Sequence, residues 1–365
     1  MYTEIIKIIE GGLSGDKEKV FNYASVLASN LKKQNELTMS SRIENLLAQK
    51  KPKSFVTVDS LASKPVDTES RMDIVSISYP DNTFSELILP KTVKDEIQEF
   101  IESFRRKDDL LRAGIEMNNN LLLYGPPGCG KTTVAEVISS MTKLPLITAQ
   151  LDGLVSSLLG STAKNLRKIF DFASTRECIL FLDEFDVIAK LRDDKNELGE
   201  LKRVVNSLIQ NIDNLPSTTI LVAATNHQDL LDSAIWRRFS KVVNLELPRE
   251  NEIEELLKLY LGNQDNAILG NEKRTLQICK ALEGLSHSDI KTITNNALKR
   301  GILSQKNCLS ASDELKEIFL FRNHAIDDEK RFVNFLLDNG ATQKEISEEQ
   351  GIPIRKIQVA IKEKN

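Results

Sequence analysis

Residues able to bind phosphate stand together within the first half of this 365-residue chain. An apolar run of strand character, Leu121 to Tyr124, leads into a glycine-rich loop, after which a helical pattern begins. The loop and the first helical residues are Gly125, Pro126, Pro127, Gly128, Cys129, Gly130, Lys131, Thr132 and Thr133. A strand, a GxxxxGK[ST] loop and a helix in this order are typical of a phosphate-binding loop. We therefore expect the chain to bind a nucleoside triphosphate.

Each part of this loop has its own chemical task. Glycines let the backbone fold tightly and turn its N–H groups toward one point, and the following helix adds partial positive charge there. Lys131 is expected to reach the β- and γ-phosphates, and the Thr132 hydroxyl to bind Mg²⁺. Because Cys129 lies between Gly128 and Gly130, we also expect a bulky thiol reagent on Cys129 to obstruct ATP.

Polar side chains follow two later apolar runs. Asp183 and Glu184 end the run that starts at Cys178, and Asn226 follows the run 220–224. At the carboxyl edge of a parallel sheet, such side chains face the ligand crevice. We expect Asp183 to support Mg²⁺ through water, Glu184 to activate the attacking water, and Asn226 to hold that water or touch the γ-phosphate. An ordinary exit from strand to turn is the alternative interpretation.

Two adjacent arginines, Arg237 and Arg238, come next along the chain. Arginine at a phosphoryl-transfer site stabilises the charge on the transferred group. Surface salt bridging is the alternative interpretation of the pair.

The elements that must position these residues alternate between strand and helix patterns. We expect strands at 120–124, near 145–148, and at 178–182, 219–224 and 241–247. Near-continuous apolar strands alternating with helices predict a parallel sheet covered on both faces. Helical periodicity fills residues 1–50 and resumes after Pro248, whereas Lys, Ser, Pro and Thr recur without period between 50 and 72.

These patterns divide the chain into six parts. We expect a helical N-terminal module at 1–50, a linker at 51–72, an α/β nucleotide-binding domain at 73–249, a helical subdomain at 250–305, a second linker at 306–324, and a module of short helices at 325–365.

Taken in order, the motifs resemble the AAA family of ATPases, within the AAA+ class, over about residues 90–300. Residues 125–132 are similar to the family's Walker A motif, Asp183 and Glu184 to Walker B, and Asn226 to sensor 1. The stretch 230–239 is similar to the one that carries paired arginine fingers, and 284–290 to the lid motif.

The resemblance implies a P-loop α/β fold with a helical lid, and ATP and Mg²⁺ as ligands. It also implies a homo-oligomeric ring, usually a hexamer, in which Arg237 and Arg238 reach the γ-phosphate of the neighbouring subunit. The chain departs from the family at three positions. Cys129 replaces a commoner threonine, His287 replaces the usual glycine, and Leu158 occupies the aromatic position of the first pore loop. Leucine can press on a substrate chain but lacks the aromatic face and rigid bulk.

The C-terminal pattern is typical of two short helices joined by a glycine turn. Thr342 can cap the first helix, Gly351 marks its end, and Pro353 opens the next. The stretch resembles the small helix-turn-helix modules of bacterial regulators, and its last helix would project cationic and amide side chains as a recognition helix does: Arg355, Lys356, Gln358 and Lys362. The module is nevertheless slightly acidic, so DNA binding and protein docking both remain open.

Composition sets broader bounds. The chain is 41% hydrophobic and 28% charged, with a net charge of −4 that gives no global reason to expect nucleic acid as a partner. Its four cysteines form no C-x-x-C pair, which argues against a zinc site and a disulfide framework. The N-terminus does not resemble a signal peptide, and no run approaches the roughly 18 apolar residues of a membrane span. We expect a cytoplasmic protein without a membrane partner.

The function predicted from the sequence is ATP hydrolysis to ADP and phosphate that drives remodelling or unfolding of a protein substrate. The first alternative is an ATP-dependent DNA-binding regulator that acts through the C-terminal helices. A third is a switch whose slow hydrolysis times its assembly with a partner. Some solitary bacterial AAA proteins of similar layout are encoded beside a subtilisin-like protease, so a serine protease is a candidate partner.

Overall fold

The computed structural model describes residues 65–66, 73–115, 118–151, 159–187, 198–231, 233–262, 264–305 and 308–364, together with positions 24, 27, 28, 31 and 39. The chain divides into two compact units, 1–63 and 64–365. The helices expected within 1–50, the linker at 51–72 and the pore-loop residue Leu158 fall largely or wholly outside the described residues.

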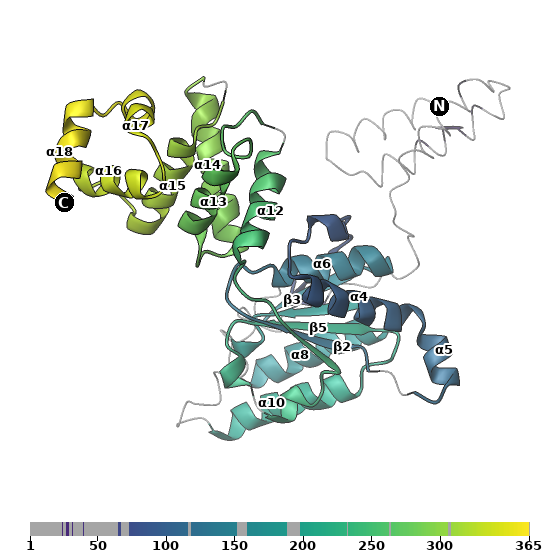
Figure 1. Ribbon diagram of the computed structural model, residues 1–365. Helices are drawn as coiled ribbons and strands as arrows, with labels where there is room; N and C mark the ends of the chain where they lie inside the picture. The colour runs from purple at the N-terminus through teal and green to yellow at the C-terminus, as the bar shows by residue number, and fades with distance from the viewer. Residues whose placement is uncertain are drawn as a thin grey trace. The chain divides into compact units, whose positions relative to one another are not determined.

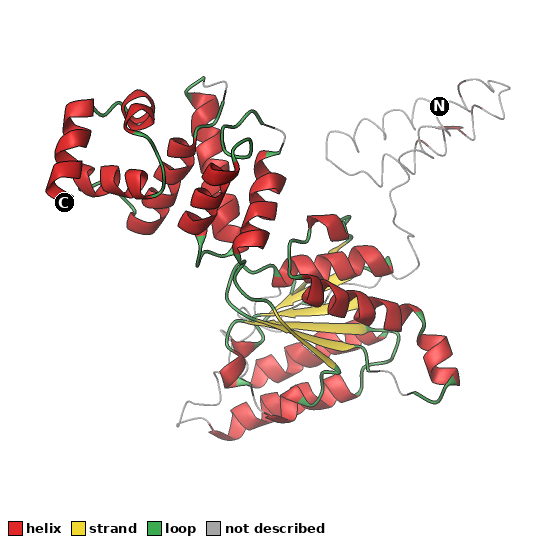
Figure 2. Cartoon of the chain, in the orientation of Figure 1, coloured by secondary structure: helices red, strands yellow, loops and turns green. Residues whose placement is uncertain are grey.

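A six-stranded sheet forms the centre of the second unit (Figures 1 and 2). Its strands are β1 (Val75–Ser78), β2 (Asn120–Tyr124), β3 (Leu146–Gln150), β4 (Ile179–Asp183), β5 (Ile220–Thr225) and β6 (Lys241–Asn244). Their order across the sheet is β1-β3-β4-β5-β2-β6. Only the edge strand β1 runs antiparallel to its neighbour. The expected parallel α/β sheet is therefore confirmed.

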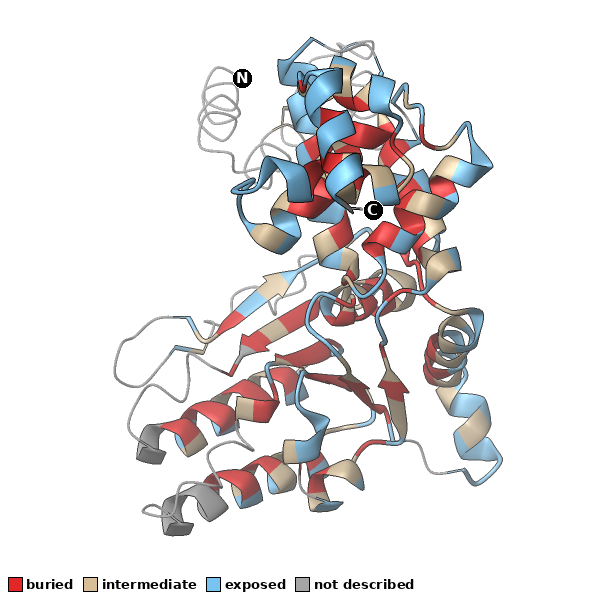
Figure 3. Cartoon of the chain, turned by 60° about the vertical axis from the view of Figure 1, so that its left-hand side comes forward, coloured by how far each residue is buried: buried red, intermediate tan, exposed pale blue. Residues whose placement is uncertain are grey.

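Helices cover both faces of this sheet. α4 (Lys91–Arg105) and α6 (Lys131–Thr142) lie on one side, and α8 (Leu159–Ser174) and α10 (Leu198–Asp213) lie on the other (Figure 1). Successive strand residues point to opposite faces, so Leu121 and Leu123 of β2 join the first core, whereas Leu122 joins the second. The inner strands β2, β4 and β5 are buried on both faces (Figure 3), which explains why their sequences are continuous apolar runs.

Smaller elements complete this domain. They are η2 (Phe84–Glu86), α5 (Lys107–Arg112), η4 (Gln228–Leu230) and α11 (Ser233–Trp236). Within the described ranges, no helix is long and apolar enough to cross a membrane.

The strand order determines where the functional loops meet. β4, β5 and β2 are consecutive in the sheet and parallel. Their carboxyl ends therefore share one edge, and the segments that leave them lie side by side. These are the segments that carry Asp183, Asn226 and the phosphate-binding loop.

In the described stretches between the sheet and residue 323 lie four helices: α12 (Glu250–Leu261), α13 (Glu272–Leu282), α14 (His287–Leu303) and α15 (Ala311–Asn323). The last of these corrects the expectation of a linker at 306–324. Ser310 and Asp313 form a capping box at the start of α15, and Leu315, Ile318 and Phe319 are buried in the same core as α12 to α14. Burial of its apolar face against α12 to α14 stabilises this helix.

Over the described residues 325–364, the chain forms three short helices: α16 (Glu329–Asp338), α17 (Gln343–Gln350) and α18 (Ile354–Lys364). Thr342 caps α17 through a capping box with Glu345, and Gly351 ends it in the left-handed region at φ 69°. Two short helices joined at Gly351 therefore lie where the sequence pattern placed them, and their role as a helix-turn-helix stays a prediction.

The C-terminal helices share one apolar core with the lid. The Phe319 ring of α15 contacts Phe332 and Phe335 of α16, at centroid distances of 5.1 and 5.4 Å. Arg274 of α13 forms an ion pair with Glu345 of α17. The lid and the last three helices are therefore packed as one helical body, where the sequence suggested two modules separated by a linker.

Candidate functional site

The phosphate-binding loop connects β2 to α6 as the sequence predicts. Gly125, Gly128 and Gly130 have φ values of 140°, 75° and 88°, which side-chain-bearing residues rarely adopt. At Gly125 a Cβ atom would also lie 2.1 Å from the carbonyl oxygen of Leu245. Gly130 is the N-cap of α6, so the positive end of that helix points into the loop.

Lys131 lies at the first position of α6 with its side chain largely buried. Its Nζ donates hydrogen bonds of 2.8 Å to the carbonyl oxygens of Gly125 and Pro126. Burial lowers the pKa of Lys131, and the charges of Asp183 and Asp186 are among the groups that oppose this shift. The ammonium group is thus held inside the loop, where an anionic phosphate can replace its carbonyl partners.

The two acids after β4 have different surroundings. Asp183 is half-buried, and its Oδ1 accepts a 2.9 Å hydrogen bond from the backbone N–H of Glu184. Glu184 is exposed and has a φ of 52°, a left-handed conformation that is uncommon for a glutamate. The backbone turns sharply at Glu184, and both carboxyl groups line the same cavity. Their different surroundings allow each to have a different role.

A third acid, Asp186, joins the ends of two strands, and the sequence reasoning missed it. Its buried Oδ1 accepts hydrogen bonds from the Thr225 hydroxyl, at 3.2 Å, and from the Asn226 backbone N–H, at 3.4 Å. Asp186 therefore fixes the position of Asn226 relative to Asp183. A single acid just after a strand carries no sequence signal of such a long-range contact.

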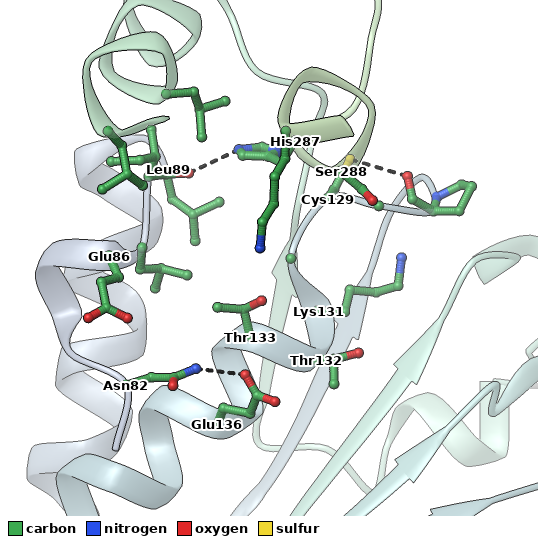
Figure 4. Close-up of a pocket in the computed structure, with 18 of the residues that line it drawn as sticks. Asn82, Glu86, Leu89, Cys129, Lys131, Thr132, Thr133, Glu136, His287 and Ser288 are labelled. Carbon is green, nitrogen blue, oxygen red and sulfur yellow. Dashed lines mark hydrogen bonds between the residues drawn. The ribbon is translucent and has the colours of Figure 1, made fainter. Parts of the chain in front are cut away.

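Most of the predicted site residues line one cavity, part of which is drawn in Figure 4. It has a volume of about 680 Å³. The predicted site residues that line it are Pro127, Gly128, Cys129, Gly130, Lys131, Thr132, Thr133, Asp183, Glu184 and Asn226. Apolar and aromatic residues, among them Leu89, Leu256 and Tyr260, line another part. A polar part for phosphates beside an apolar part for a base is the division that a nucleotide requires.

The start of α14 forms the lid side of this cavity. The backbone N–H of Ser288 donates a 3.1 Å hydrogen bond to the carbonyl oxygen of Gly128 in the phosphate-binding loop. A Cβ atom at Gly128 would lie 2.4 Å from the Ser286 hydroxyl, so only glycine permits this approach. The lid thus contacts the loop directly through its backbone.

His287, which replaces the usual glycine of the lid motif, also joins the lid to the domain. Its Nε2 lies 3.0 Å from the carbonyl oxygen of Ile88 (Figure 4). A carbonyl oxygen only accepts, so Nε2 carries the hydrogen. Burial lowers the pKa of His287 below its ordinary value, which keeps the ring neutral at pH 7. His287 therefore makes a side-chain contact between the lid and the α/β domain that a glycine at this position could not make.

The structure corrects our expectation for Cys129. Although Cys129 is among the residues that line the cavity, it has no exposed surface and belongs to the apolar core between the sheet and α6. Burial raises the pKa of the Cys129 thiol, which disfavours the reactive thiolate. We therefore expect that a thiol reagent in solution does not reach this sulfur.

The oxygen donors in the cavity fit Mg²⁺. Thr132 supplies a hydroxyl and Asp183 a carboxylate to the same space, and Mg²⁺ prefers few protein oxygens together with phosphates and water. Across the described parts of the chain, no group of three or more His, Cys, Asp and Glu side chains is arranged to hold a metal ion. Thr132 and Asp183 are the residues suited to bind Mg²⁺ alongside a nucleotide.

The two arginines do not line this cavity. Arg237 is exposed, and Arg238 is partly buried and paired with Asp213. The structure thus brings together the loop, Asp183, Glu184 and Asn226, and leaves Arg237 and Arg238 outside their own subunit's cavity.

Known proteins share these features. A family model described as "ATPase family associated with various cellular activities (AAA)" matches residues 121–247. An uncharacterized AAA family ATPase of Sinorhizobium fredii is 37% identical over 263 residues, which cover 72% of this chain and 76% of the relative.

More distant relatives match over less of their own length. A proteasome-activating nucleotidase of Methanopyrus kandleri is 29% identical over 275 residues, covering 73% of this chain and 62% of the relative. A chloroplastic ATP-dependent zinc metalloprotease of Arabidopsis thaliana is 30% identical over 223 residues, covering 59% of this chain and 28% of the relative. With the loop and strand-end residues in one cavity, these matches show that the chain belongs to the AAA family of ATPases.

Proposed function

We propose that this chain hydrolyses ATP at the cavity described above and uses the energy to remodel or unfold protein substrates as a hexameric ring. The observation that carries the proposal is the meeting of three strand ends. The segments after β2, β4 and β5 bring Lys131, Glu184 and Asn226 to one cavity, and these residue types suffice to bind a triphosphate and direct water at it.

Binding of ATP is the task of the loop. Its backbone N–H groups and the N-terminus of α6 surround the phosphates, while Lys131 exchanges its carbonyl partners for the β- and γ-phosphate oxygens. Thr132 and Asp183 would hold Mg²⁺, which would neutralise charge on the phosphates. The base occupies the apolar part of the cavity beside Leu89 and Tyr260.

Hydrolysis is the task of the strand ends. Glu184 accepts a proton from the attacking water, which general base catalysis requires. The Asn226 side chain orients that water. Asp186 keeps Asn226 in place by accepting a hydrogen bond from the Asn226 backbone N–H. The products are ADP and phosphate.

The segment that carries Arg237 and Arg238 completes the site of the neighbouring subunit. Their place outside their own cavity supports this assignment, because an arginine that acts within its own subunit would have to line it. Arginine supplied in trans stabilises charge in the transition state of phosphoryl transfer.

Support for a protein substrate comes from the relatives. One is named a proteasome-activating nucleotidase and another an ATP-dependent protease, and both names refer to the processing of proteins. A trapping experiment tests this part. Glu184→Gln should bind ATP without hydrolysing it and hold the substrate in the ring, so affinity purification with ATP should recover the same proteins reproducibly. Lys131→Ala is the matched control and should recover none. Equal recovery by both variants would contradict the proposal.

A DNA-binding regulator is the second candidate. The observation in its favour is the outward face of α18, where Arg355, Gln358 and Lys362 are exposed. Against it, Lys356 of the same helix pairs with Glu329 at 3.0 Å, so part of the positive charge is neutralised. Adding unfolded protein or duplex DNA separates the candidates. We expect unfolded protein to stimulate ATP turnover, and stimulation by duplex DNA alone would favour the regulator.

A further inference from the structure

The segment that carries the two arginines is fixed to its own subunit by contacts on both sides of the pair. The Trp236 ring meets the Tyr124 ring edge to face at 5.9 Å, and Phe239 meets Phe185 at 6.0 Å. Tyr124 directly precedes the phosphate-binding loop, and Phe185 directly follows Glu184. The arginines are therefore held next to both motifs of the subunit that carries them.

The two guanidinium groups differ in their contacts. Arg238 Nε and Nη2 each lie 3.2 Å from one oxygen of Asp213, the last residue of α10, and Arg238 Nη1 donates a 2.9 Å hydrogen bond to the carbonyl oxygen of Ala234. The Arg237 side chain is exposed. Among the residues that the structure describes, none is a partner of the Arg237 guanidinium.

The backbone at Arg238 is held as well. Its carbonyl oxygen accepts hydrogen bonds from the side-chain amides of Asn120, at 2.9 Å, and Asn118, at 3.1 Å. Arg238 thus contacts β2 through its backbone and α10 through its side chain. To reach a neighbouring subunit, it would have to give up a two-pronged ion pair, which is the stronger geometry for arginine and carboxylate. Arg237 would break no such contact.

We propose that the two arginines have different roles. Arg237 reaches the phosphates of the neighbouring subunit, and Arg238 is a positioning residue that holds the segment on Asp213. The proposal rests on the function proposed above, in which this segment completes the neighbour's site. The family resemblance, in contrast, implies that both residues are arginine fingers with the same role.

A double-mutant cycle between Asp213 and Arg238 tests this division. Arg237→Ala should lower ATP turnover by roughly 10³-fold or more, as expected for a lost arginine finger. Arg238→Ala and Asp213→Ala should each lower turnover by about tenfold, because misplacement by about 1 Å can cost up to 10²-fold. If Arg238 acts through Asp213, the double variant should be no slower than either single variant.

Two controls accompany the cycle. Asp109→Ala removes the carboxylate that faces Arg112 within the surface helix α5 and should leave turnover unchanged. ATP should still bind to every variant of the cycle, because the phosphate-binding loop is unchanged and an arginine finger acts mainly on the transition state; this measurement also confirms that the variants fold.

The proposal of different roles would be overturned if Asp213→Ala kept the wild-type turnover while Arg238→Ala were as slow as Arg237→Ala. Arg238 would then act without its ion pair to Asp213. Additive losses in the double variant would overturn it as well. Glu184→Gln is measured alongside. If Glu184→Gln keeps the wild-type rate, the proposed hydrolytic site itself is wrong. If Glu184→Gln loses its activity, a failed cycle contradicts only the roles proposed for the two arginines.

Discussion

Binding and hydrolysis of ATP depend on different residues of the cavity. Lys131→Ala should weaken ATP binding by about 10- to 100-fold, because each hydrogen bond to a charged group contributes about 1.5–3 kcal/mol. Glu184→Gln should keep the affinity for ATP but lower turnover by roughly 10²–10⁴-fold, since only activation of water is lost. A nucleotide titration and a phosphate-release assay measure the two effects. Equal affinities in both variants would contradict these roles.

The four cysteines differ in their accessibility. Cys129, Cys178 and Cys279 are buried, and Cys308 is exposed. Burial raises the pKa of Cys178 and of Cys279 to about 12, which disfavours their thiolates.

A bulky maleimide should therefore label one thiol of the native chain. Cys308→Ser should abolish this labelling, and Cys129→Ser should leave it unchanged, as measured by intact mass. Labelling of Cys129 that slows on addition of ATP would show that its thiol faces the nucleotide.

Among the elements, α15 stands out for the acids it buries. Glu314 has no exposed surface, and its Oε1 accepts a 2.8 Å hydrogen bond from the Thr294 hydroxyl of α14. Burial raises the pKa of Glu314 from 4.5 to about 7. An acid with a higher pKa in the folded state binds its proton more tightly there. Its contribution to stability is therefore complete below about pH 4.5 and is lost as the pH rises through about 7.

This shift should make the protein less stable at pH 8 than at pH 5, by about 2.5 kcal/mol from Glu314. Glu314→Gln should remove most of this difference in urea unfolding. Glu317, whose pKa burial also raises, leaves a remainder of the same sign. Glu348→Gln, which changes an exposed acid of α17, is the control and should keep the wild-type pH dependence. An unchanged pH dependence in Glu314→Gln would mean that Glu314 is charged in the folded state.

The elements could be predicted where a local pattern determined them. The strands β2, β4 and β5 appear as apolar runs because both faces of the sheet are covered, and the glycines of the phosphate loop are required by its backbone. Helix α15 was missed, although Leu315, Ile318 and Phe319 have helical spacing, because the stretch before it lacks a pattern. Asp186 and the Arg238–Asp213 pair depend on residues 25 to 40 positions apart, and no local pattern reports such contacts.

At the scale of the whole molecule, the last three helices belong to the lid. Removing residues 325–365 would expose the apolar surface around Phe319 that Phe332 and Phe335 cover. We expect this truncation to lower the thermal unfolding temperature and to cause aggregation. Phe332→Ala, which keeps all helices, should destabilise by about 3–5 kcal/mol, as large-to-small changes in a core do. A truncated chain with wild-type unfolding temperature would show that these helices are a separable module.

The central claim is that each active site is shared between two subunits of a ring. Subunits with Arg237→Ala keep an intact phosphate-binding loop, and subunits with Lys131→Ala keep intact arginines, so each variant alone should hydrolyse ATP very slowly. Mixing the two should restore part of the turnover, at the interfaces where an intact loop meets an intact Arg237. Mass measurement of the mixture confirms that mixed rings form. If mixed rings are present and no ratio of the two variants restores hydrolysis, the shared site is contradicted.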